Sequence, residues 1–212
     1  MGADNHGIRA IFFDFGGVIL EGFDGVDHDA IEAEFELEAK ALRKWVYRDS
    51  RYMDFQIGRV TYDEWTDSIR KAMAAGGQGE RADTMVKRFQ EAERLVNHDM
   101  VGLIKRLHGH YKLGIISNTI PGMMDRLRRL LDFVDLFDVV VGSGDVGIAK
   151  PDEGIFLRAT EEAGVTPKQS VFTDDRADFA EAARAVGMHG FHFTDYERFV
   201  EDLRSVGVEA WQ

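Results

Sequence analysis

The stretch IFFDFGGVIL, residues 11–20, joins a short apolar run to one carboxylate, Asp14, and a pair of glycines. The apolar residues are consecutive rather than alternating with polar ones, which is typical of a strand buried on both faces of a parallel sheet. Asp14 comes at the carboxyl end of this predicted strand, and Gly16 and Gly17 let the chain turn after it. The stretch therefore predicts a central strand that ends in an acidic side chain.

Four further apolar runs predict strands, and segments with helical spacing lie between them. The runs are YKLGIISN (111–118), LFDVVVG (136–142), SVFTDD (170–175) and MHGFHF (188–193). The helical segments are PGMMDRLRRLLDFV (121–134), DEGIFLRATEEAG (152–164) and RADFAEAARAVG (176–187), the last two ending in a glycine typical of a helix C-terminus. Strands alternating with helices indicate right-handed βαβ units. The predicted fold is α/β, with a doubly wound, Rossmann-like parallel sheet.

The long interval between the first and second predicted strands contains almost no strand-like run. Apolar residues there recur at helical spacing in three stretches, at 27–49, 61–77 and 80–96. Thr61 followed by Glu64 is the pattern of a capping box at the head of the second stretch. These features predict a helical cap inserted after the first strand. The predicted units are a core of residues 1–20 and 98–212 and a cap of residues 21–97.

The composition excludes several kinds of site and partner. The chain of 212 residues contains no cysteine, so disulfides and thiolate metal sites are ruled out. Its formal net charge of −12 argues against nucleic acid and anionic membranes as partners. No apolar run approaches the roughly 20 residues that a membrane-spanning helix needs, and the N-terminus lacks the layout of a signal peptide. We therefore expect a cytoplasmic protein, with its oligomeric state left open.

Polar residues follow three of the predicted strands, and a lysine precedes the helix that leads into the fourth. In an open α/β sheet, ligands bind at the carboxyl ends of the strands, so these side chains are expected to converge there. Each of them alone is also typical of a turn, a helix cap or a solvated surface. The prediction of a site therefore depends on the whole set, which is Asp14, Ser117, Asn118, Lys150, Asp174 and Asp175.

Phosphoryl transfer is one chemistry that such a set could perform. The Asp14 carboxylate could attack phosphorus and form an aspartyl-phosphate, which divides a difficult hydrolysis into two easier steps. Asp175 could hold Mg²⁺ together with Asp14, because Mg²⁺ prefers carboxylates, water and substrate phosphate as ligands. Ser117 and Lys150 could bind the nonbridging phosphoryl oxygens, over which the transition-state charge is spread.

The same residues lie in segments that resemble the four motifs of the haloacid dehalogenase superfamily of hydrolases. FFDFGGVI resembles the first motif, IISNT the second, GIAKPDEGIF the third and VFTDDRADFAEAARAVG the fourth, and the resemblance runs over residues 9–193. The helical insert falls where the family has its C1 cap. The chain most resembles the subgroup whose first motif reads D-x-G-(G/N)-V, which includes α-D-glucose-1-phosphate phosphatase.

The resemblance implies a role for each matching residue. Asp14 and Lys150 match catalytic residues, Asp14 as the nucleophile. Ser117 and Asn118, together with Lys150, match the residues that bind the phosphoryl group. The Mg²⁺ ligands that it implies are Asp14, the carbonyl of Gly16, Asp175 and, with weaker support, Asp174. Asp178 is a further candidate for the metal's surroundings, since Phe179 stands where the family usually has another acid or an asparagine.

Gly16 departs from the family's phosphatases, which usually carry an aspartate two residues after the nucleophile. That aspartate protonates the leaving oxygen and later activates water, and general acid–base catalysis contributes roughly 10²–10⁴-fold. A substrate with a good leaving group, such as a sugar 1-phosphate or an acyl phosphate, would need less protonation. A cap side chain could also supply the proton, and the candidates nearest in sequence are Asp24, Asp27, His28 and Asp29.

The sequence therefore predicts a Mg²⁺-dependent hydrolase, a phosphatase of small phosphorylated metabolites such as sugar phosphates. Two alternatives stay open because of Gly16. One is a metal-independent 2-haloacid dehalogenase, since such enzymes also lack the second aspartate. The other is a protein of this fold with little or no turnover, which binds a phosphorylated ligand or a protein partner.

Overall fold

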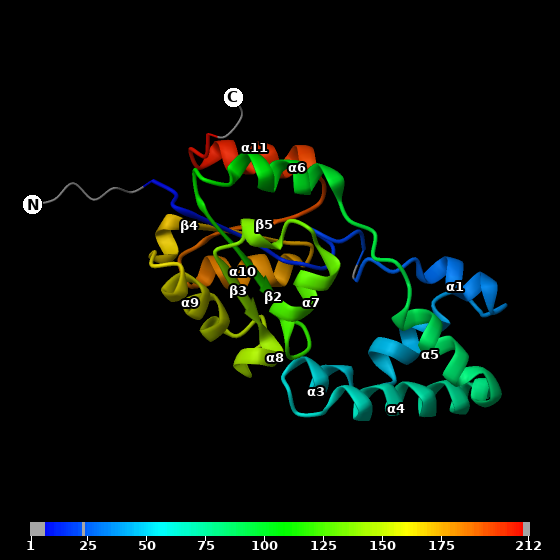
Figure 1. Cartoon of the computed structure of the whole chain (residues 1–212). Coiled ribbons are helices and arrows are strands. Elements are labelled where there is room, and N and C mark those ends of the chain that lie inside the picture. Colours follow the sequence, from blue (N-terminus) through cyan, green and yellow to red (C-terminus); the bar gives the residue numbers. More distant parts are fainter. Residues whose placement is uncertain (1–6, 23, 210–212) are drawn as a thin grey trace, which may run out of the picture.

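Five parallel strands form one sheet in the order β3-β2-β1-β4-β5 (Figure 1). The computed structural model of the chain describes residues 7–22 and 24–209. The strands are β1 (Ala10–Phe13), β2 (Lys112–Ser117), β3 (Val139–Gly142), β4 (Ser170–Asp174) and β5 (His189–His192). Each strand coincides with one of the predicted apolar runs. The predicted α/β fold with a doubly wound parallel sheet is confirmed.

The first strand, β1, lies at the centre of the sheet and is buried on both faces. Phe13 pairs with Ile115 of β2 on one side and with Thr173 of β4 on the other. Successive side chains of a strand point to opposite faces, so Phe13 lies in one apolar cluster and Phe12 in the other. Burial on both faces explains why the apolar residues of this strand are consecutive.

Helices cover both faces of the sheet (Figure 1). The face that holds Phe13 packs against α6 (His98–Leu107), α7 (Met123–Leu130) and α11 (Tyr196–Ser205), and the other face against α9 (Glu153–Glu162) and α10 (Ala177–Ala185). The short elements η4 (Val134–Leu136), α8 (Ser143–Val146) and η5 (Pro167–Gln169) lie in the connections. Gly164 and Gly187 follow α9 and α10 with φ of +67° and +96°, as expected for glycines that end helices.

The helices of residues 28–90, which lie between β1 and α6 in the chain, form a separate unit that we call the cap segment. Its elements are α1 (His28–Glu34), α2 (Ala41–Arg43), η1 (Lys44–Arg48), α3 (Tyr52–Gln56), α4 (Tyr62–Met73), η2 (Ala74–Gln78), η3 (Gly79–Arg81) and α5 (Ala82–Gln90). They enclose their own apolar cluster, distinct from the two against the sheet. The predicted capping box is present, with reciprocal hydrogen bonds between Thr61 and Glu64 at the head of α4. The helical insert is confirmed, while the proposed boundaries after residues 20 and 97 stay a prediction.

The first helical stretch of the cap segment, at 27–49, is broken rather than continuous. Between α1 and α2 the backbone takes positive φ values at Glu36 (53°) and Lys40 (69°). The buried Glu32 carboxylate accepts hydrogen bonds from the N–H groups of Lys40 (2.7 Å) and Leu42 (2.9 Å). This carboxylate satisfies backbone amides at the start of the next helix, so it stabilises a break that apolar spacing does not reveal.

The two linkers that join the cap segment to the sheet lie side by side. The N–H of Glu21 donates to the carbonyl of Leu95 (2.9 Å), the N–H of Leu95 to that of Gly25 (2.8 Å), and the N–H of Asn97 to that of Ile19 (2.9 Å). The stretch at 80–96 is therefore helical only as far as α5, although its helical spacing continues to residue 96. An extended return linker held by these bonds follows.

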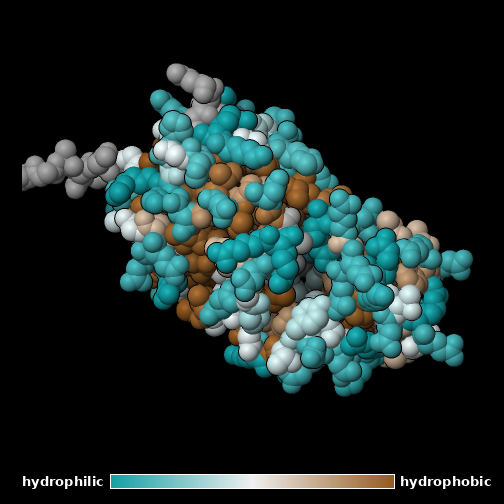
Figure 2. Space-filling model, in the orientation of Figure 1, coloured by the Kyte–Doolittle hydropathy of each residue, from teal (hydrophilic) through white to brown (hydrophobic). Residues whose placement is uncertain are grey.

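The molecular surface is largely hydrophilic on the face that Figure 2 shows, with apolar side chains gathered in patches over the sheet-bearing part. Across residues 7–22 and 24–209, none of the helices is both long and apolar enough to span a bilayer.

Candidate active site

The ammonium group of Lys150 lies at the carboxyl ends of β1 and β4, between two predicted catalytic and metal-binding acids. Its Nζ is 2.8 Å from Oδ1 of Asp14 and 2.6 Å from Oδ2 of Asp174, and it donates to the carbonyl of Ile116 at 3.0 Å. Lys150 is only 4% exposed. A buried ammonium is tolerated when it is paired and hydrogen-bonded. The structure thus brings together residues from the first, third and fourth predicted motifs.

Three carboxylates meet beside this lysine. Asp14, Asp174 and Asp175 each offer one oxygen within 4.8 Å of the others. Asp14 and Asp174 are buried, whereas Asp175 is exposed. Gly16, whose carbonyl is the fourth predicted metal ligand, follows Asp14 by two residues. No described residue donates a hydrogen bond to this carbonyl oxygen, which leaves it available to a cation. An all-oxygen set of this kind suits a hard divalent cation such as Mg²⁺.

The electrostatics of the cluster also favour a cation. Burial and the charge of Asp14 raise the pKa of Asp174 to about 7, although Lys150 opposes the shift. Burial and Asp14 also raise the pKa of Asp175. Burial disfavours the Lys150 ammonium, but the charges of Asp14 and Asp174 outweigh it and raise the lysine pKa. One lysine therefore does not neutralise the acids fully, and these residues fit an additional cation.

The raised pKa of Asp174 predicts a pH-dependent stability for the metal-free protein. A native carboxyl with a pKa of about 7 holds a proton that the unfolded chain releases near its ordinary value of 3.8. The free energy of unfolding should therefore fall as pH rises from about 4 to 7. We expect the unfolding temperature to drop by a few degrees more between pH 5 and pH 8 in the wild type than in Asp174→Asn.

Mg²⁺ should reverse this loss, raising the unfolding temperature more at pH 8 than at pH 5. Differential scanning fluorimetry with EDTA or with MgCl₂ measures both effects. An equal pH slope in wild type and Asp174→Asn would show that Asp174 does not titrate in this interval.

The predicted metal ligand Asp175 is held against the backbone of Gly17. A Cβ atom placed on Gly17 would lie 2.5 Å from the Asp175 carboxyl carbon, and the φ of Gly17 is +73°. Gly22, with φ of +60°, has nothing within 4 Å of such an atom. Gly17 therefore allows a close approach in addition to a left-handed backbone.

Gly17→Ala is expected to displace the Asp175 carboxylate and to weaken Mg²⁺ binding about 10-fold or more, the effect typical of disturbed metal surroundings. Gly22→Ala carries a similar backbone penalty without the clash, so its Mg²⁺ affinity should stay within about twofold of the wild type. Calorimetric titration of Mg²⁺ into both variants makes the comparison. Equal affinities would contradict a role for Asp175 in holding the metal.

Ser117 and Asn118, the polar residues of the second predicted motif, differ in their contacts. Ser117 is 5% exposed, and within the described part of the chain its hydroxyl makes no hydrogen bond. The side-chain amide of Asn118 binds the Lys150 backbone, accepting from its N–H (2.7 Å) and donating to its carbonyl (2.9 Å). Asn118 thus positions Lys150. Substrate binding by Asn118 and by Ser117 stays a prediction.

Two contacts that the sequence does not reveal attach the cap segment to this motif. Gln56, at the end of α3, donates from Nε2 to the carbonyl of Asn118 at 2.9 Å. The hydroxyl of Ser143 donates to the carbonyl of Gln56 at 2.5 Å and accepts from the N–H of Thr119 at 2.9 Å. Ser143 and Thr119 follow neighbouring strands, so α3 is fixed to the same edge of the sheet as the carboxylates.

Asp178 and Phe179 do not belong to the cluster of three carboxylates. Asp178 is exposed and forms an ion pair with Arg176 at 2.6 Å. The buried ring of Phe179 lies 5.2 Å from the Lys150 ammonium, a cation–π contact at the position where the family usually has an acid or asparagine. A metal-related role for Asp178 stays a prediction.

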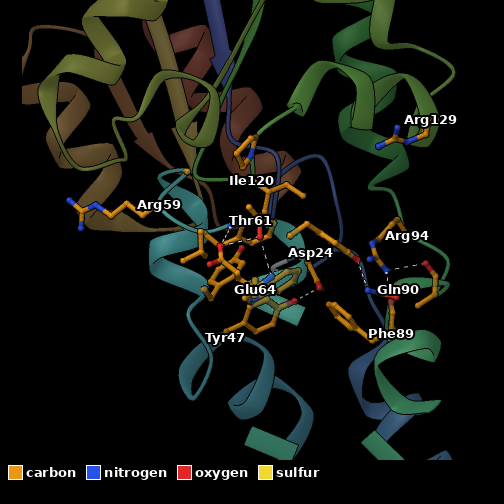
Figure 3. A pocket seen from close by; sticks show the side chains of 18 residues that line it. Asp24, Tyr47, Arg59, Thr61, Glu64, Phe89, Gln90, Arg94, Ile120 and Arg129 are labelled. Atoms are coloured by element: carbon orange, nitrogen blue, oxygen red, sulfur yellow. Dashed lines mark hydrogen bonds between the residues drawn. The ribbon is translucent and has the colours of Figure 1, made fainter. Parts of the chain in front are cut away.

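Of the four cap residues considered as proton donors, Asp24 faces a cavity of about 800 Å³ (Figure 3). Asp24 accepts hydrogen bonds from the N–H of Val26 (3.0 Å) and the hydroxyl of Tyr47, and it contacts Nε2 of His28 (3.0 Å). Burial opposes its charge, but His28 and Tyr47 outweigh burial and lower its pKa. Asp24 is therefore ionised near neutral pH, which disfavours it as a proton donor.

The other acidic candidates are engaged elsewhere. Asp27 caps the N-terminus of α1 by accepting from the N–H of Ala30, and Asp29 forms an exposed ion pair with Arg43 at 3.2 Å. His28 is buried and faces Asp24.

The cavity lies between the cap segment and the loop after β2. Its core-side wall includes Ile120 and Pro121, while Asp14, Asp174 and Asp175 are not among its lining residues. The cap-side wall includes six aromatic residues, which are Tyr47, Tyr52, Phe55, Tyr62, Trp65 and Phe89. The three carboxylates and this cavity therefore occupy different places in the structure.

The comparison with protein families assigns the chain clearly. The model described as haloacid dehalogenase-like hydrolase matches residues 8–187. Among curated relatives, the sesquiterpene phosphatase astK of Aspergillus oryzae is 25% identical over 201 residues, which cover 93% of this chain and 96% of its own length. Phosphatase MT3486 of Mycobacterium tuberculosis is 36% identical over 104 residues, 46% of this chain and 47% of its own.

The fold comparison agrees. The HAD family enzyme bt-2542 of Bacteroides thetaiotaomicron, solved in complex with magnesium and inorganic phosphate, superposes with a TM-score of 0.68. It is 22% identical, and the match covers 91% of this chain and 99% of that enzyme. Since the family model spans most of the sequence and its predicted motifs converge at one sheet edge, this protein belongs to the haloacid dehalogenase-like hydrolases.

Proposed function

We propose that the protein is a Mg²⁺-dependent phosphatase that hydrolyses phosphate monoesters through an aspartyl-phosphate on Asp14. The observation that carries the proposal is the Lys150 ammonium, held 2.8 Å from Asp14 and 2.6 Å from Asp174 beside a third carboxylate. Two relatives with phosphatase in their names support the same reaction class.

The metal would be held by Asp14, Asp175, the carbonyl of Gly16 and Asp174. When bound, Mg²⁺ supplies positive charge that neutralises the phosphoryl oxygens and aligns the group for attack. The burial of Asp14 and Asp174 keeps this charge in a low-dielectric place, where electrostatic stabilisation is strong.

In the first step a carboxylate oxygen of Asp14 bonds to phosphorus, and the bond from phosphorus to the ester oxygen breaks. Within residues 7–22 and 24–209, Oδ1 of Asp14 contacts Lys150 and no hydrogen bond reaches Oδ2, which leaves an oxygen for attack. The Ser117 hydroxyl binds a phosphoryl oxygen, and the Lys150 ammonium binds another by exchanging one of its three contacts with Asp14, Asp174 and the Ile116 carbonyl, as charge builds on these oxygens. Water then hydrolyses the acyl phosphate, which restores Asp14 and releases inorganic phosphate.

The leaving alkoxide has to take its proton from water, because Gly16 carries no acid. Esters of acidic alcohols and acyl phosphates should therefore be hydrolysed much faster than esters of ordinary alcohols.

Gly16→Asp is expected to restore this missing function. Gly16 is not among the described glycines with positive φ, so a side chain there meets no left-handed strain. Turnover of alkyl phosphates should rise by roughly 10²-fold, while p-nitrophenyl phosphate, whose leaving group needs little protonation, should change much less. Gly16→Asn, which cannot donate an acidic proton, is the matched control. An equal gain for both esters would contradict the acid–base explanation.

The proposal is tested by phosphate release from p-nitrophenyl phosphate, acetyl phosphate and sugar phosphates, with Mg²⁺ or with EDTA. We expect turnover that requires Mg²⁺. Activity on 2-chloropropionate in EDTA, with no phosphate release, would instead identify a dehalogenase. Absence of both reactions with retained phosphate binding would identify a ligand-binding protein.

Two kinds of alcohol are candidates for the organic half of the substrate. The sequence favours sugar phosphates, whereas the name of astK points to a terpenoid phosphate. The lining of the cavity distinguishes between them.

A further inference from the structure

We infer that the organic half of the substrate is an apolar hydrocarbon alcohol, long or cyclic, rather than a sugar, an inference that rests on the proposed phosphatase function. The observation behind it is the aromatic wall of the cavity between the cap segment and the loop after β2 (Figure 3). Its volume of about 800 Å³ is within the range of roughly 300–1,000 Å³ typical of small-molecule sites.

The aromatic rings of the wall form a continuous series. The ring of Trp65 stacks on Phe55 with centroids 4.6 Å apart and contacts Tyr52 and Tyr62 at 5.7 and 5.8 Å. Tyr52 contacts Tyr47 at 4.9 Å. Such rings provide a large apolar surface in a fixed arrangement, which suits hydrocarbon groups.

Most of the polar groups that line the cavity have partners within the protein. Of the three arginines in the lining, Arg94 donates to the carbonyl of Ala92 at 3.0 Å and Arg59 pairs with Asp54 at 3.9 Å, while Arg129 is exposed. Asp24 is held by Tyr47 and by its contact with His28. Glu64 and Thr61 bind each other in the capping box, and Gln90 donates to the hydroxyl of Tyr62 at 2.5 Å. Recognition of a sugar requires several convergent polar groups, and here most such groups have partners within the protein.

The cavity adjoins the proposed phosphoryl site through two short connections. Phe55 of the wall precedes Gln56, whose amide contacts the carbonyl of Asn118, the neighbour of Ser117. On the core side, Ile120 of the wall lies in the loop directly after Ser117 and packs against the apolar cluster of the cap segment. The loop after β2 thus borders both the proposed phosphoryl site and the cavity, so one substrate could occupy both places.

The experiment uses n-alkylphosphonates, which keep the phosphoryl charge but cannot be hydrolysed. Calorimetric titration into the Mg²⁺-loaded protein gives the dissociation constant for methyl-, butyl- and octylphosphonate, all below their micellar concentrations. Burial of each methylene strengthens binding by up to about fourfold. We expect octylphosphonate to bind at least tenfold more tightly than butylphosphonate, and glucose 6-phosphate to bind no better than methylphosphonate.

Tyr62 offers a variant whose ring lies at the accessible part of the wall, since it is 44% exposed. Tyr62→Ala should weaken octylphosphonate binding about fivefold more than methylphosphonate binding. Tyr62→Phe keeps the ring and is the matched control, with the wild-type preference for the octyl chain retained. 1-Octanol tests whether the phosphonate group is needed, and we expect it to bind much more weakly than octylphosphonate.

Affinities independent of chain length, or glucose 6-phosphate bound most tightly, would overturn the inference. Octanol bound as tightly as octylphosphonate would also overturn it, because the cavity would then be separate from the phosphoryl site. These outcomes differ from failure of the proposed function, in which phosphonates bind with the expected chain-length dependence but no phosphate ester is hydrolysed.

Discussion

Turnover of every phosphate ester should fall by about 10⁴-fold or more in Asp14→Asn, because an amide cannot form the acyl phosphate. The substitution keeps the size of the side chain in a site that is 8% exposed, so the fold should be retained. In the wild type, acid quenching during turnover should trap a phosphate adduct on the peptide that contains residue 14. Mass spectrometry detects this adduct, and the variant should lack it.

The control for this prediction is Asp99→Asn, which removes the same charge from the exposed first turn of α6. Its turnover should stay within about twofold of the wild type. Wild-type turnover without a trapped adduct, or substantial activity in Asp14→Asn, would indicate direct attack by water instead.

Lys150→Met should abolish turnover and also destabilise the fold, which separates it from Asp14→Asn. Asp174 is 0% exposed and Asp14 8%, so removal of the lysine leaves two buried carboxylates without their cation. Breaking such a buried pair costs about 3–5 kcal/mol. For a chain of this size that corresponds to a fall of roughly 10 °C in the unfolding temperature.

The pH dependence tests the cause of this destabilisation. Lys150 opposes protonation of Asp174, so its loss should raise the Asp174 pKa further above 7. Below about pH 7 Asp174 is protonated in both folded proteins, so the stability difference between variant and wild type should shrink as pH falls to about 7 and stay constant below it. Thermal unfolding measured in EDTA at several pH values follows this difference.

Lys71→Met is the matched control, because Lys71 forms an exposed ion pair with Asp67 at 2.6 Å. Pairs of this kind contribute about 0–1 kcal/mol, so the variant should unfold near the wild-type temperature at every pH. If Lys150→Met were as stable as Lys71→Met, the buried contacts of Lys150 would have no role in holding the site together.

The sheet and the acid cluster could be predicted from the sequence because both depend on short-range patterns. Consecutive apolar residues mark strands buried on both faces, and the carboxyl ends of parallel strands meet at one edge. Asp14 and Asp174 were therefore expected at the same edge of the sheet, and the pairing of β1 with β4 places them on neighbouring strands. Lys150 followed from its motif rather than from any periodicity.

The features that the sequence did not reveal depend on contacts between distant residues. The break after α1 is fixed by the Glu32 carboxylate, which reaches amides eight and ten residues further along. The bond from Gln56 to Asn118 spans 62 residues. Trp65 has the apolar spacing expected of a core residue and is 5% exposed, yet it also lines the cavity. Helical periodicity assigns a side chain to the inner face of a helix without saying whether that face closes a core or a binding site.

The paired linkers have a consequence for how such a chain can change over evolution. Because the chain leaves the sheet at residues 19–25 and returns at 95–97 through adjacent hydrogen-bonded segments, the residues between them are joined covalently to the core at one place only, and their other contacts with it, such as the bond from Gln56 to Asn118, are noncovalent. Insertions, deletions or exchange of whole helices in that interval need not alter the register of any strand or the spacing of Asp14, Asp174 and Asp175. The segment that supplies most of the cavity lining can thus change while the sheet and its acidic cluster stay the same.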